Sequence, residues 1–171
     1  MSLSGLLSIN EVNELDLDQF IWLFGNVIEK RTQACNYVFE KRPFQSAKHI
    51  ILLYSKYLDT LKQCEQEEIL QSHPDLGASC KMTDESVREQ GSCGINDLEQ
   101  EEREELSELN LRYKEKFGFP FVICARQNKA DSILSAMKIR LDNDRDVELR
   151  TGIGEVKKIC ALRVFDLVWH D

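Results

Sequence analysis

The sequence predicts an all-α protein, and three features of the 171-residue chain favour this fold class. Polar and apolar residues recur at helical spacing along most of the chain. Only three prolines and eight glycines interrupt it. One run, Phe119–Ala125, is rich in β-forming residues, but no second clear strand is present to pair with it. We therefore expect a single domain over residues 1–171, a helical bundle with one extended segment at Phe119–Ala125.

Two helices in the first third of the chain are predicted from capping residues followed by an apolar face. Asp16 and Gln19 have the spacing of a capping box, and the face that follows ends near Lys30. Its members are Phe20, Leu23, Phe24, Val27 and Ile28. Ser46 is a suitable N-cap for the next helix, and Pro43 breaks whatever precedes it. The inward face of that helix consists of Ile50, Leu53, Tyr57, Leu58 and Leu61.

Three longer helical patterns follow in the second half of the chain. One begins near Leu98 and ends at Gly118, and its apolar stripe is Leu106, Leu109, Tyr113 and Phe117. Asp131 is suited to cap the next helix, whose inward residues are Ile133, Leu134, Met137 and Leu141. The last pattern runs from about Val147 to Val168, with Val156, Cys160, Val164 and Leu167 facing inward.

Composition excludes several classes of partner and site. The formal net charge of −8 and the pI near 5.0 oppose a nucleic-acid-binding or anionic-membrane surface. No window approaches eighteen uninterrupted apolar residues, so we expect no membrane-spanning helix. The six cysteines contain no CxxC pair and the three histidines lack short ligand spacing, so no metal site is predicted. Dispersed cysteines of this kind favour a reduced, intracellular compartment.

The stretch SHPDLG, residues 72–77, places a histidine directly before a proline at the end of a predicted helix. Proline restricts the residue before it to extended conformations, so the backbone of His73 is expected to be held in place. A titratable ring on fixed backbone is suited to act as an acid or a base. A capping or hydrogen-bonded structural histidine explains the same pattern.

A second concentration of polar residues follows Thr83, a plausible N-cap. Ser86, Glu89 and Gln90 then share one helix face, where a hydroxyl, a carboxylate and an amide converge. Such a face can bind a ligand rich in amide-like donors and acceptors, although the same spacing is typical of an exposed helix. Arg163 lies among apolar residues of the last helix, where its alternative role is an ion pair at the edge of the core.

The extended run Phe119–Ala125 raises the question of which groups satisfy its backbone. A lone buried strand leaves N–H and C=O groups that need partners, and a bound polar ligand can supply some of them. The alternative interpretation is that this run is the start of a core helix.

Taken in order along the chain, these residues resemble the family of 2-oxo-4-hydroxy-4-carboxy-5-ureidoimidazoline (OHCU) decarboxylases. The resembling runs are Phe24–Asn26, Arg42–Phe44, His73–Leu76, Glu85–Gln90, Tyr113–Arg126, Glu155–Ile159 and Leu162–Arg163. They cover nearly the whole chain, which makes the resemblance far more specific than any one motif.

The resemblance implies an all-α enzyme of urate degradation that works without a metal or organic cofactor, usually as a homodimer. Its reaction converts OHCU, a small ureide, to (S)-allantoin and CO2, with stereospecific protonation of the carbanion. By the matching motifs, His73 is the catalytic acid/base, with Glu89 and Arg163 as its polar partners. The implied substrate-binding residues are Pro74, Ser86, Val87, Arg88, Glu89, Gln90, Phe121, Val122, Ile123, Cys124 and Ala125, the last five partly through their backbone.

The chain departs from the family pattern at Gly77–Ala78, at the small-residue run Gly91–Ile95, where Cys93 stands in place of a smaller residue, and at Gly152–Ile153. The glycine costs up to about 1 kcal/mol relative to a better helix former, so Gly152 predicts a break in the last helix. None of these departures removes a polar group that the family motifs require.

Two other functions fit the residues. The chain could be a helical scaffold that binds ureides without turning them over, or a different cofactor-free acid/base enzyme such as a ureide hydrolase or racemase. Localisation is open between peroxisome and cytosol, because the final residues Trp169-His170-Asp171 do not form an SKL-type ending.

Overall fold

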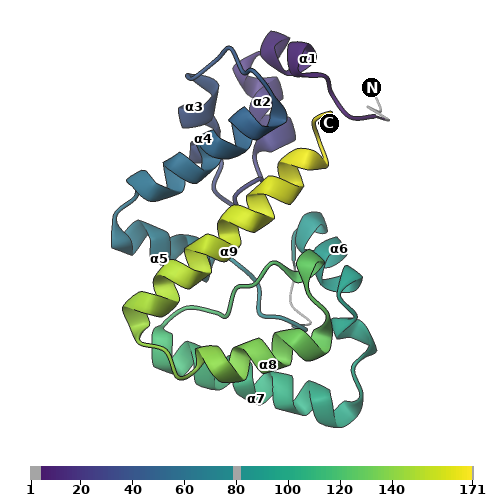
Figure 1. The fold of residues 1–171 in the computed structure, drawn as a ribbon, viewed down its shortest axis with the longest axis vertical. Coiled ribbons are helices and arrows are strands. Elements are labelled where there is room, and N and C mark those ends of the chain that lie inside the picture. The colour runs from purple at the N-terminus through teal and green to yellow at the C-terminus, as the bar shows by residue number, and fades with distance from the viewer. Residues whose placement is uncertain (1–4, 79–81, 171) are drawn as a thin grey trace. The chain divides into compact units, whose positions relative to one another are not determined.

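A computed structural model describes residues 5–78 and 82–170, and Figure 1 shows the order of their helices. Nine α-helices and two short 3-10 helices occur in these ranges, and no strand is present there. Within these ranges, Leu7 and Val168 form an isolated parallel β-bridge. The all-α prediction is confirmed. No helix in the described ranges has the length and apolar character needed to cross a bilayer.

The chain forms two compact units. Unit 1 consists of residues 1–65 and 157–171, and unit 2 of residues 66–156. The boundaries fall inside two helices, α5 (Gln63–Gln71) and α9 (Arg145–Phe165). The expectation that residues 1–171 fold as a single domain stays a prediction, which coincident unfolding transitions from probes in each unit would support.

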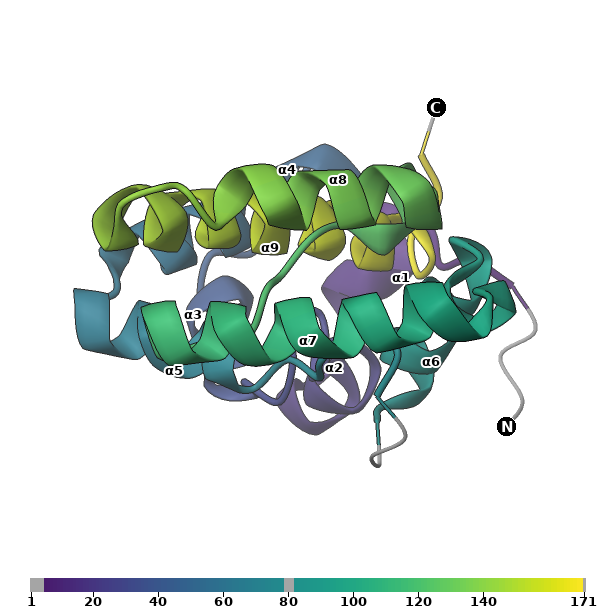
Figure 2. The same ribbon diagram turned by 90° about the horizontal axis from the view of Figure 1, so that it is seen from below.

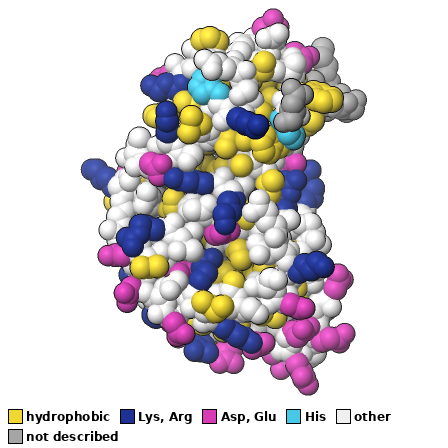
Figure 3. All heavy atoms as spheres, in the orientation of Figure 1, with side chains coloured by type: hydrophobic (Ala, Val, Ile, Leu, Met, Phe, Trp, Pro, Cys, Tyr) yellow, Lys and Arg dark blue, Asp and Glu magenta, His cyan; other side chains and the backbone are white. Residues whose placement is uncertain are grey.

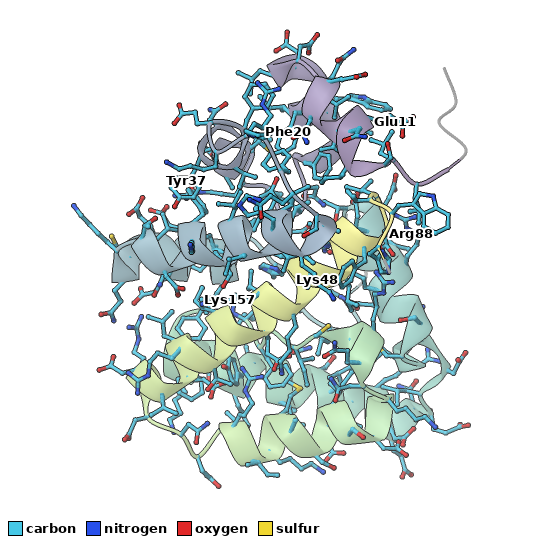
Figure 4. The ribbon with its side chains drawn as sticks, turned by 45° about the horizontal axis from the view of Figure 1, so that its top comes forward. Glu11, Phe20, Tyr37, Lys48, Arg88 and Lys157 are labelled. Carbon is cyan, nitrogen blue, oxygen red and sulfur yellow. The ribbon has the colours of Figure 1, made fainter. Side chains whose placement is uncertain are left out.

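Unit 1 is built from short capped helices around an aromatic core. The helices are α1 (Ile9–Glu14), α2 (Leu17–Phe24), α3 (Gln33–Phe39) and α4 (Ala47–Thr60). The predicted capping box of Asp16 and Gln19 starts α2, and Ser46 accepts a hydrogen bond from the His49 N–H at the start of α4. Phe20 lies among these helices and stacks on Phe24 with ring centroids 4.4 Å apart (Figure 4).

The apolar face predicted to run toward Lys30 continues beyond the C-terminal end of α2. α2 ends at Phe24, so Val27 and Ile28 lie in the connection to α3, where both are buried. Lys30 in that connection has a positive φ of 51°, a conformation that no helix continues through. The pattern therefore identified buried residues correctly but overestimated the length of the helix.

Unit 2 contains α6 (Asp84–Ser92), α7 (Gln100–Phe117) and α8 (Ala130–Arg140), with 3-10 turns η1 (Ile95–Asp97) and η2 (Ala125–Gln127). α7 and α8 lie side by side in Figures 1 and 2. Gly118 ends α7 as predicted, with a φ of 80°. Acidic side chains gather where α7 begins, at the lower right of Figure 3, and most of its acidic run is exposed. The run is therefore a solvated helix face.

Two details of unit 2 differ from the sequence-based expectation. Asp131 does not cap α8, because the helix already begins at Ala130, whose N–H donates to the Cys93 C=O at 2.9 Å. Gly152 does not break α9, which is continuous. A Cβ at Gly152 would lie 2.9 Å from the Leu70 Cδ1 atom, so glycine allows α5 and α9 to pack closely at this point.

The core of unit 2 is aromatic where α7 meets the segment that follows it. The Tyr113 ring packs on Phe117 at 4.5 Å and contacts Phe121 edge-on at 5.3 Å. Phe119 stacks on Phe117 at 6.1 Å. Burying each of these side chains stabilises the fold by about 1.5–3 kcal/mol. This cluster fixes the position of the predicted extended segment.

Candidate functional site

His73 lies just after α5, at the helix end that the sequence predicts. Its backbone N–H donates to the Leu70 C=O at 3.1 Å, and its ring Nδ1 lies 2.8 Å from the Ile69 C=O. A carbonyl oxygen only accepts hydrogen bonds, so Nδ1 carries the proton of the neutral ring. Nε2 is therefore the nitrogen that takes up or releases a proton, and both the tautomer and the ring orientation are set by α5.

The loop that follows His73 is held by two amide side chains. The Gly77 N–H donates to Gln90 Oε1 at 2.9 Å, and Gln90 Nε2 donates to the Asp75 C=O at 3.4 Å. Asn110 on α7 donates to the Leu76 C=O at 2.9 Å. The predicted ligand-binding amide of Gln90 thus ties α6 to the loop beside the histidine.

The polar face of α6 is largely buried. Thr83 caps the helix by accepting from the Ser86 N–H at 3.3 Å, as predicted. Ser86 is only 4% exposed and Gln90 only 6%, and Glu89 is half-buried. The alternative interpretation of this face as the exposed side of a soluble helix is therefore wrong.

Val87 and Arg88, also predicted to bind substrate, lie on the other side of α6. Val87 is 49% exposed and Arg88 is exposed; Arg88 is labelled in Figure 4. Their side chains do not belong to the buried polar face, because residues that follow Ser86 by one or two positions turn away from it around the helix.

The segment before η2 is neither helix nor strand, so the alternative that it starts a core helix is wrong. Its buried side chains are Phe121, Val122, Cys124 and Ala125, and Ile123 is half-buried. Side chains satisfy part of its backbone. Arg140 Nη1 donates to the Val122 C=O, the Cys124 N–H donates to Glu155 Oε2, and Asn128 Nδ2 donates to the Cys124 C=O, each at 2.9 Å.

Three of the predicted site elements are joined within unit 2. Gln90 connects α6 to the loop beside His73, and α6 packs against η2, where the extended segment ends. The bond from the Ala130 N–H to the Cys93 C=O ties the end of α6 to the start of α8. A buried hydroxyl, a half-buried carboxylate and a tautomerically fixed imidazole therefore belong to one connected set of elements.

Arg163 belongs to unit 1. Its Nη1 donates to the Asn26 C=O at 2.7 Å and to Glu29 Oε2 at 2.8 Å, and both charged side chains are almost fully buried. The ion pair considered for Arg163 from the sequence is present, although between fully buried partners. The catalytic role of Arg163 stays a prediction.

Sequence reasoning missed the charged residues behind the extended segment. Arg140 pairs with Glu148, which is fully buried and also accepts from Tyr113 Oη and from Asn143 Nδ2. Burial, followed by the hydrogen bond to Glu148, raises the pKa of Tyr113 far above its ordinary value. One signal was present: Glu148 and Glu155 are seven residues apart, a spacing that places both on one face of the last helix.

Five cysteines are described, and all are free thiols: Cys35, Cys64, Cys93, Cys124 and Cys160. Burial raises the pKa of Cys35 and of Cys93. Cys80 and the terminal Asp171 lie outside the described residues. Within the ranges that the structure describes, no three metal-ligating side chains come together.

Known proteins resemble this chain over nearly its whole length. The profile of the OHCU decarboxylase family matches residues 13–165. The 2-oxo-4-hydroxy-4-carboxy-5-ureidoimidazoline decarboxylase of Xenopus laevis is 39% identical over 169 residues, covering 96% of this chain and 97% of that protein. A putative decarboxylase of the same name from Homo sapiens is 39% identical, with 96% and 98% coverage.

A solved structure agrees in fold. The crystal structure of an OHCU decarboxylase in the presence of (S)-allantoin aligns with a TM-score of 0.68 at 24% identity, covering 87% of this chain and 96% of that one. With both the family profile and close relatives matching along the chain, the protein belongs to the OHCU decarboxylase family.

Proposed function

We propose that the protein is a carboxy-lyase that converts 2-oxo-4-hydroxy-4-carboxy-5-ureidoimidazoline to (S)-allantoin and CO2 in urate degradation. Membership of the family supports the reaction. The observation that carries the proposal is the 2.8 Å contact between His73 Nδ1 and the Ile69 C=O, because it makes Nε2 the proton-exchanging atom of a fixed ring. Pro74 follows directly and restricts the backbone on which that ring sits.

The reaction needs an electron sink and a proton donor. Loss of CO2 leaves its electron pair on a ring carbon of the substrate, where the neighbouring C=N and C=O groups delocalise it. The substrate is therefore its own electron sink. The neighbouring carbon, which bears the ureido group, then takes up a proton, while the hydroxyl on the decarboxylated carbon loses its proton and becomes a carbonyl. Delivery of the new C–H proton from one face by His73 Nε2 gives a single enantiomer of allantoin.

Two further charged residues complete the proposed catalytic set. Glu89, half-buried on α6, orients or stabilises the imidazolium form of His73. Arg163 stabilises the developing oxyanion rather than the departing carboxylate. A tight grip on the carboxylate would stabilise the ground state and slow its loss, which is why we favour the oxyanion.

The proposed binding set consists of uncharged donors and acceptors. Pro74 and the buried Ser86 and Gln90 supply side-chain contacts, and the stretch from Phe121 to Ala125 contributes backbone groups suited to a ureide. Val87 and Arg88 enter this set only as the helical neighbours of Ser86 and Glu89, because their side chains are exposed.

We also propose that the chain acts as a homodimer, inside the cell, without a metal or organic cofactor. The five described thiols are all free, which supports a reducing compartment, either cytosol or peroxisome. Sedimentation of the purified protein tests the dimer. Activity that survives dialysis against a chelator tests the cofactor proposal, and the location of a fluorescently tagged chain distinguishes the two compartments.

The activity is tested by circular dichroism of allantoin formed from freshly generated OHCU, with and without enzyme. OHCU is expected to decay spontaneously to racemic product, so the wild-type protein should add both speed and one-handed (S)-allantoin. Racemic product at the uncatalysed rate in the presence of wild-type protein would reject the decarboxylase.

The role of His73 is tested in the same assay with His73→Ala and His73→Asn. Asparagine retains an N–H that can donate to the Ile69 C=O but has no titratable nitrogen. Both variants should lose turnover at least roughly 100-fold. His49→Ala is the matched control, because His49 lies in unit 1, where its ring accepts from the Gln45 N–H at the start of α4. Near-normal turnover by His73→Asn would contradict the acid/base role.

A further inference from the structure

Side chains anchor the backbone of the segment before η2. The Val122 C=O accepts from Arg140, the Cys124 N–H donates to Glu155, and the Cys124 C=O accepts from Asn128. The three bonds therefore hold the residues on both sides of Ile123.

Ile123 lies between the two anchored residues. Across the part of the chain that the structure describes, its N–H and C=O make no hydrogen bond. Its side chain is half-buried. An unpaired backbone edge of this kind binds ligands whose own N–H and C=O groups are spaced like those of a peptide. A ureido group has this pattern.

The anchors themselves are rigid. Arg140 is 8% exposed, pairs with the fully buried Glu148, and lies over the Phe121 ring at 4.2 Å. Its guanidinium plane is thus fixed from two directions before it reaches the Val122 C=O. Glu155 is carried by the continuous helix α9, which also carries Glu148. Neither anchor can shift by much without moving a helix.

We propose that Arg140 and Glu155 are positioning residues that fix Val122 and Cys124, so that the Ile123 N–H and C=O bind the ureido group of the substrate. This inference rests on the proposed function, because it assigns a task within the same site. The two side chains act through the backbone and touch no reacting atom. Their contribution is therefore to substrate orientation, where a displacement of about 1 Å can cost roughly 100-fold in rate.

Kinetics of two Glu155 variants test the positioning role. Glu155→Ala removes the acceptor of the Cys124 N–H and should lower kcat/KM roughly 10- to 100-fold, with KM changing more than kcat, because ureido binding persists from ground state to transition state. Glu155→Gln keeps an acceptor oxygen and should stay within about threefold of wild type. Glu105→Ala is the control, since Glu105 is also half-buried in unit 2 but pairs with Lys138 at 2.6 Å.

Hydrogen exchange of the Cys124 amide gives a second readout that does not depend on activity. In the wild type this amide is protected by its bond to Glu155. Glu155→Ala should accelerate its exchange at least roughly tenfold, while Glu155→Gln and Glu105→Ala should not. General loss of protection throughout unit 2 would instead mean that the variant unfolds, and would overturn a role confined to the segment.

Two kinetic outcomes overturn the inference while leaving the proposed function intact. One is wild-type kcat/KM in Glu155→Ala. The other is equal damage by alanine and glutamine, because the carboxylate charge rather than the acceptor would then be needed. Failure of the proposed function is seen separately, as wild-type protein that does not accelerate the conversion of OHCU.

Discussion

Among the residues that the structure describes, each unit buries an arginine–glutamate pair, and the two pairs differ in what else they hold. In unit 1, Arg163 pairs with Glu29 at 2.8 Å, and in unit 2, Arg140 pairs with Glu148. Both glutamate side chains are completely buried, and neither arginine side chain is more than 10% exposed. Burial and pairing alone therefore do not distinguish a scaffold residue from a catalytic one.

The elements that carry the carboxylates separate the two pairs. Glu148 sits on helix α9 and accepts from Tyr113 and Asn143 as well as from Arg140. That network joins helices α7, α8 and α9 of unit 2. Glu29 lies instead in the connection between α2 and α3, next to Lys30 with its positive φ. Arg163 thus holds a turn, through Glu29 and the Asn26 C=O, whereas Arg140 holds helices and the extended segment.

The largest expected effect concerns the unit 1 pair and combines activity with stability. Arg163→Met removes the guanidinium that pairs with the buried Glu29 carboxylate, which should cost about 3–5 kcal/mol of unfolding free energy. Adding Glu29→Gln removes the second charge and should recover most of that loss. Activity should remain at least roughly 100-fold below wild type in both variants if Arg163 stabilises an oxyanion. Urea unfolding and kcat/KM measure the two quantities.

A double variant of the unit 1 pair that regains both stability and turnover would make Arg163 a structural residue. The ion-pair interpretation of the sequence would then be sufficient for this position. The two ion pairs would then differ only in the structural elements that they connect.

The unit 2 pair should show the same loss of stability with a smaller loss of activity. Arg140→Met should cost about 3–5 kcal/mol of unfolding free energy by removing the cation beside the buried Glu148 carboxylate. Glu148→Gln in the same chain should restore most of it, since an amide can still accept from Tyr113. The kcat/KM of the double variant should fall roughly tenfold, because the Val122 C=O loses its anchor. A loss as large as that in unit 1 would mean that Arg140 does more than position the backbone.

The sequence could predict what depends on neighbours along the chain. The capping box at Asp16 and Gln19, the cap at Ser46 and the cap at Thr83 all appear as expected, because a cap needs residues only three apart. Gly118 ends α7 for a similarly local reason. Thr83 and Gly118 delimit helices α6 and α7 of unit 2, so this part of the helical frame of the unit that contains His73 was predictable.

Contacts between distant parts of the chain could not be predicted in this way. Residue spacing gave no sign that Leu70 packs on Gly152. Spacing also assigned the cap of α8 to Asp131, because it could not reveal that the Ala130 N–H bonds to the distant Cys93 C=O. The residues behind the site were missed for the same reason. Arg140 reaches the segment from α8, and a guanidinium in an apolar pattern does not reveal which carbonyl it will meet.

Buried tyrosines extend the comparison to alkaline pH, with one in each unit. Burial raises the pKa of Tyr54 and of Tyr113, helped by Cys35 in the first case and by Glu148 in the second. Above a pH of about 10 the unfolded chain loses these protons while the folded chain keeps them. Stability is therefore fully present below that pH and falls above it, by up to about 1.4 kcal/mol per pH unit for each tyrosine.

Urea unfolding of the wild type and of Tyr113→Phe below and above a pH of about 10 measures how the unfolding free energy depends on pH. The variant should lose roughly half of the slope that the two tyrosines contribute. Tyr54→Phe should remove a similar share from unit 1. If the unfolding free energy of Tyr113→Phe fell with pH as steeply as that of the wild type, Tyr113 would ionise normally in the folded protein. The hydrogen bond between Tyr113 and Glu148 would then not hold the proton on the tyrosine.

The smallest effects come from two glycines of α9 within unit 2, which test how tightly that helix is packed. A Cβ at Gly152 would lie 2.9 Å from Leu70, whereas a Cβ at Gly154 would meet nothing within 4 Å. Gly154→Ala should therefore raise the unfolding free energy by up to about 1 kcal/mol through helix propensity. Gly152→Ala gains the same propensity but must displace Leu70, so it should lower stability by about 1–2 kcal/mol. Thermal unfolding of the two variants compares them directly. If both stabilise equally, Leu70 gives way at no cost, and the glycine at 152 is not required for the close approach of α5 and α9.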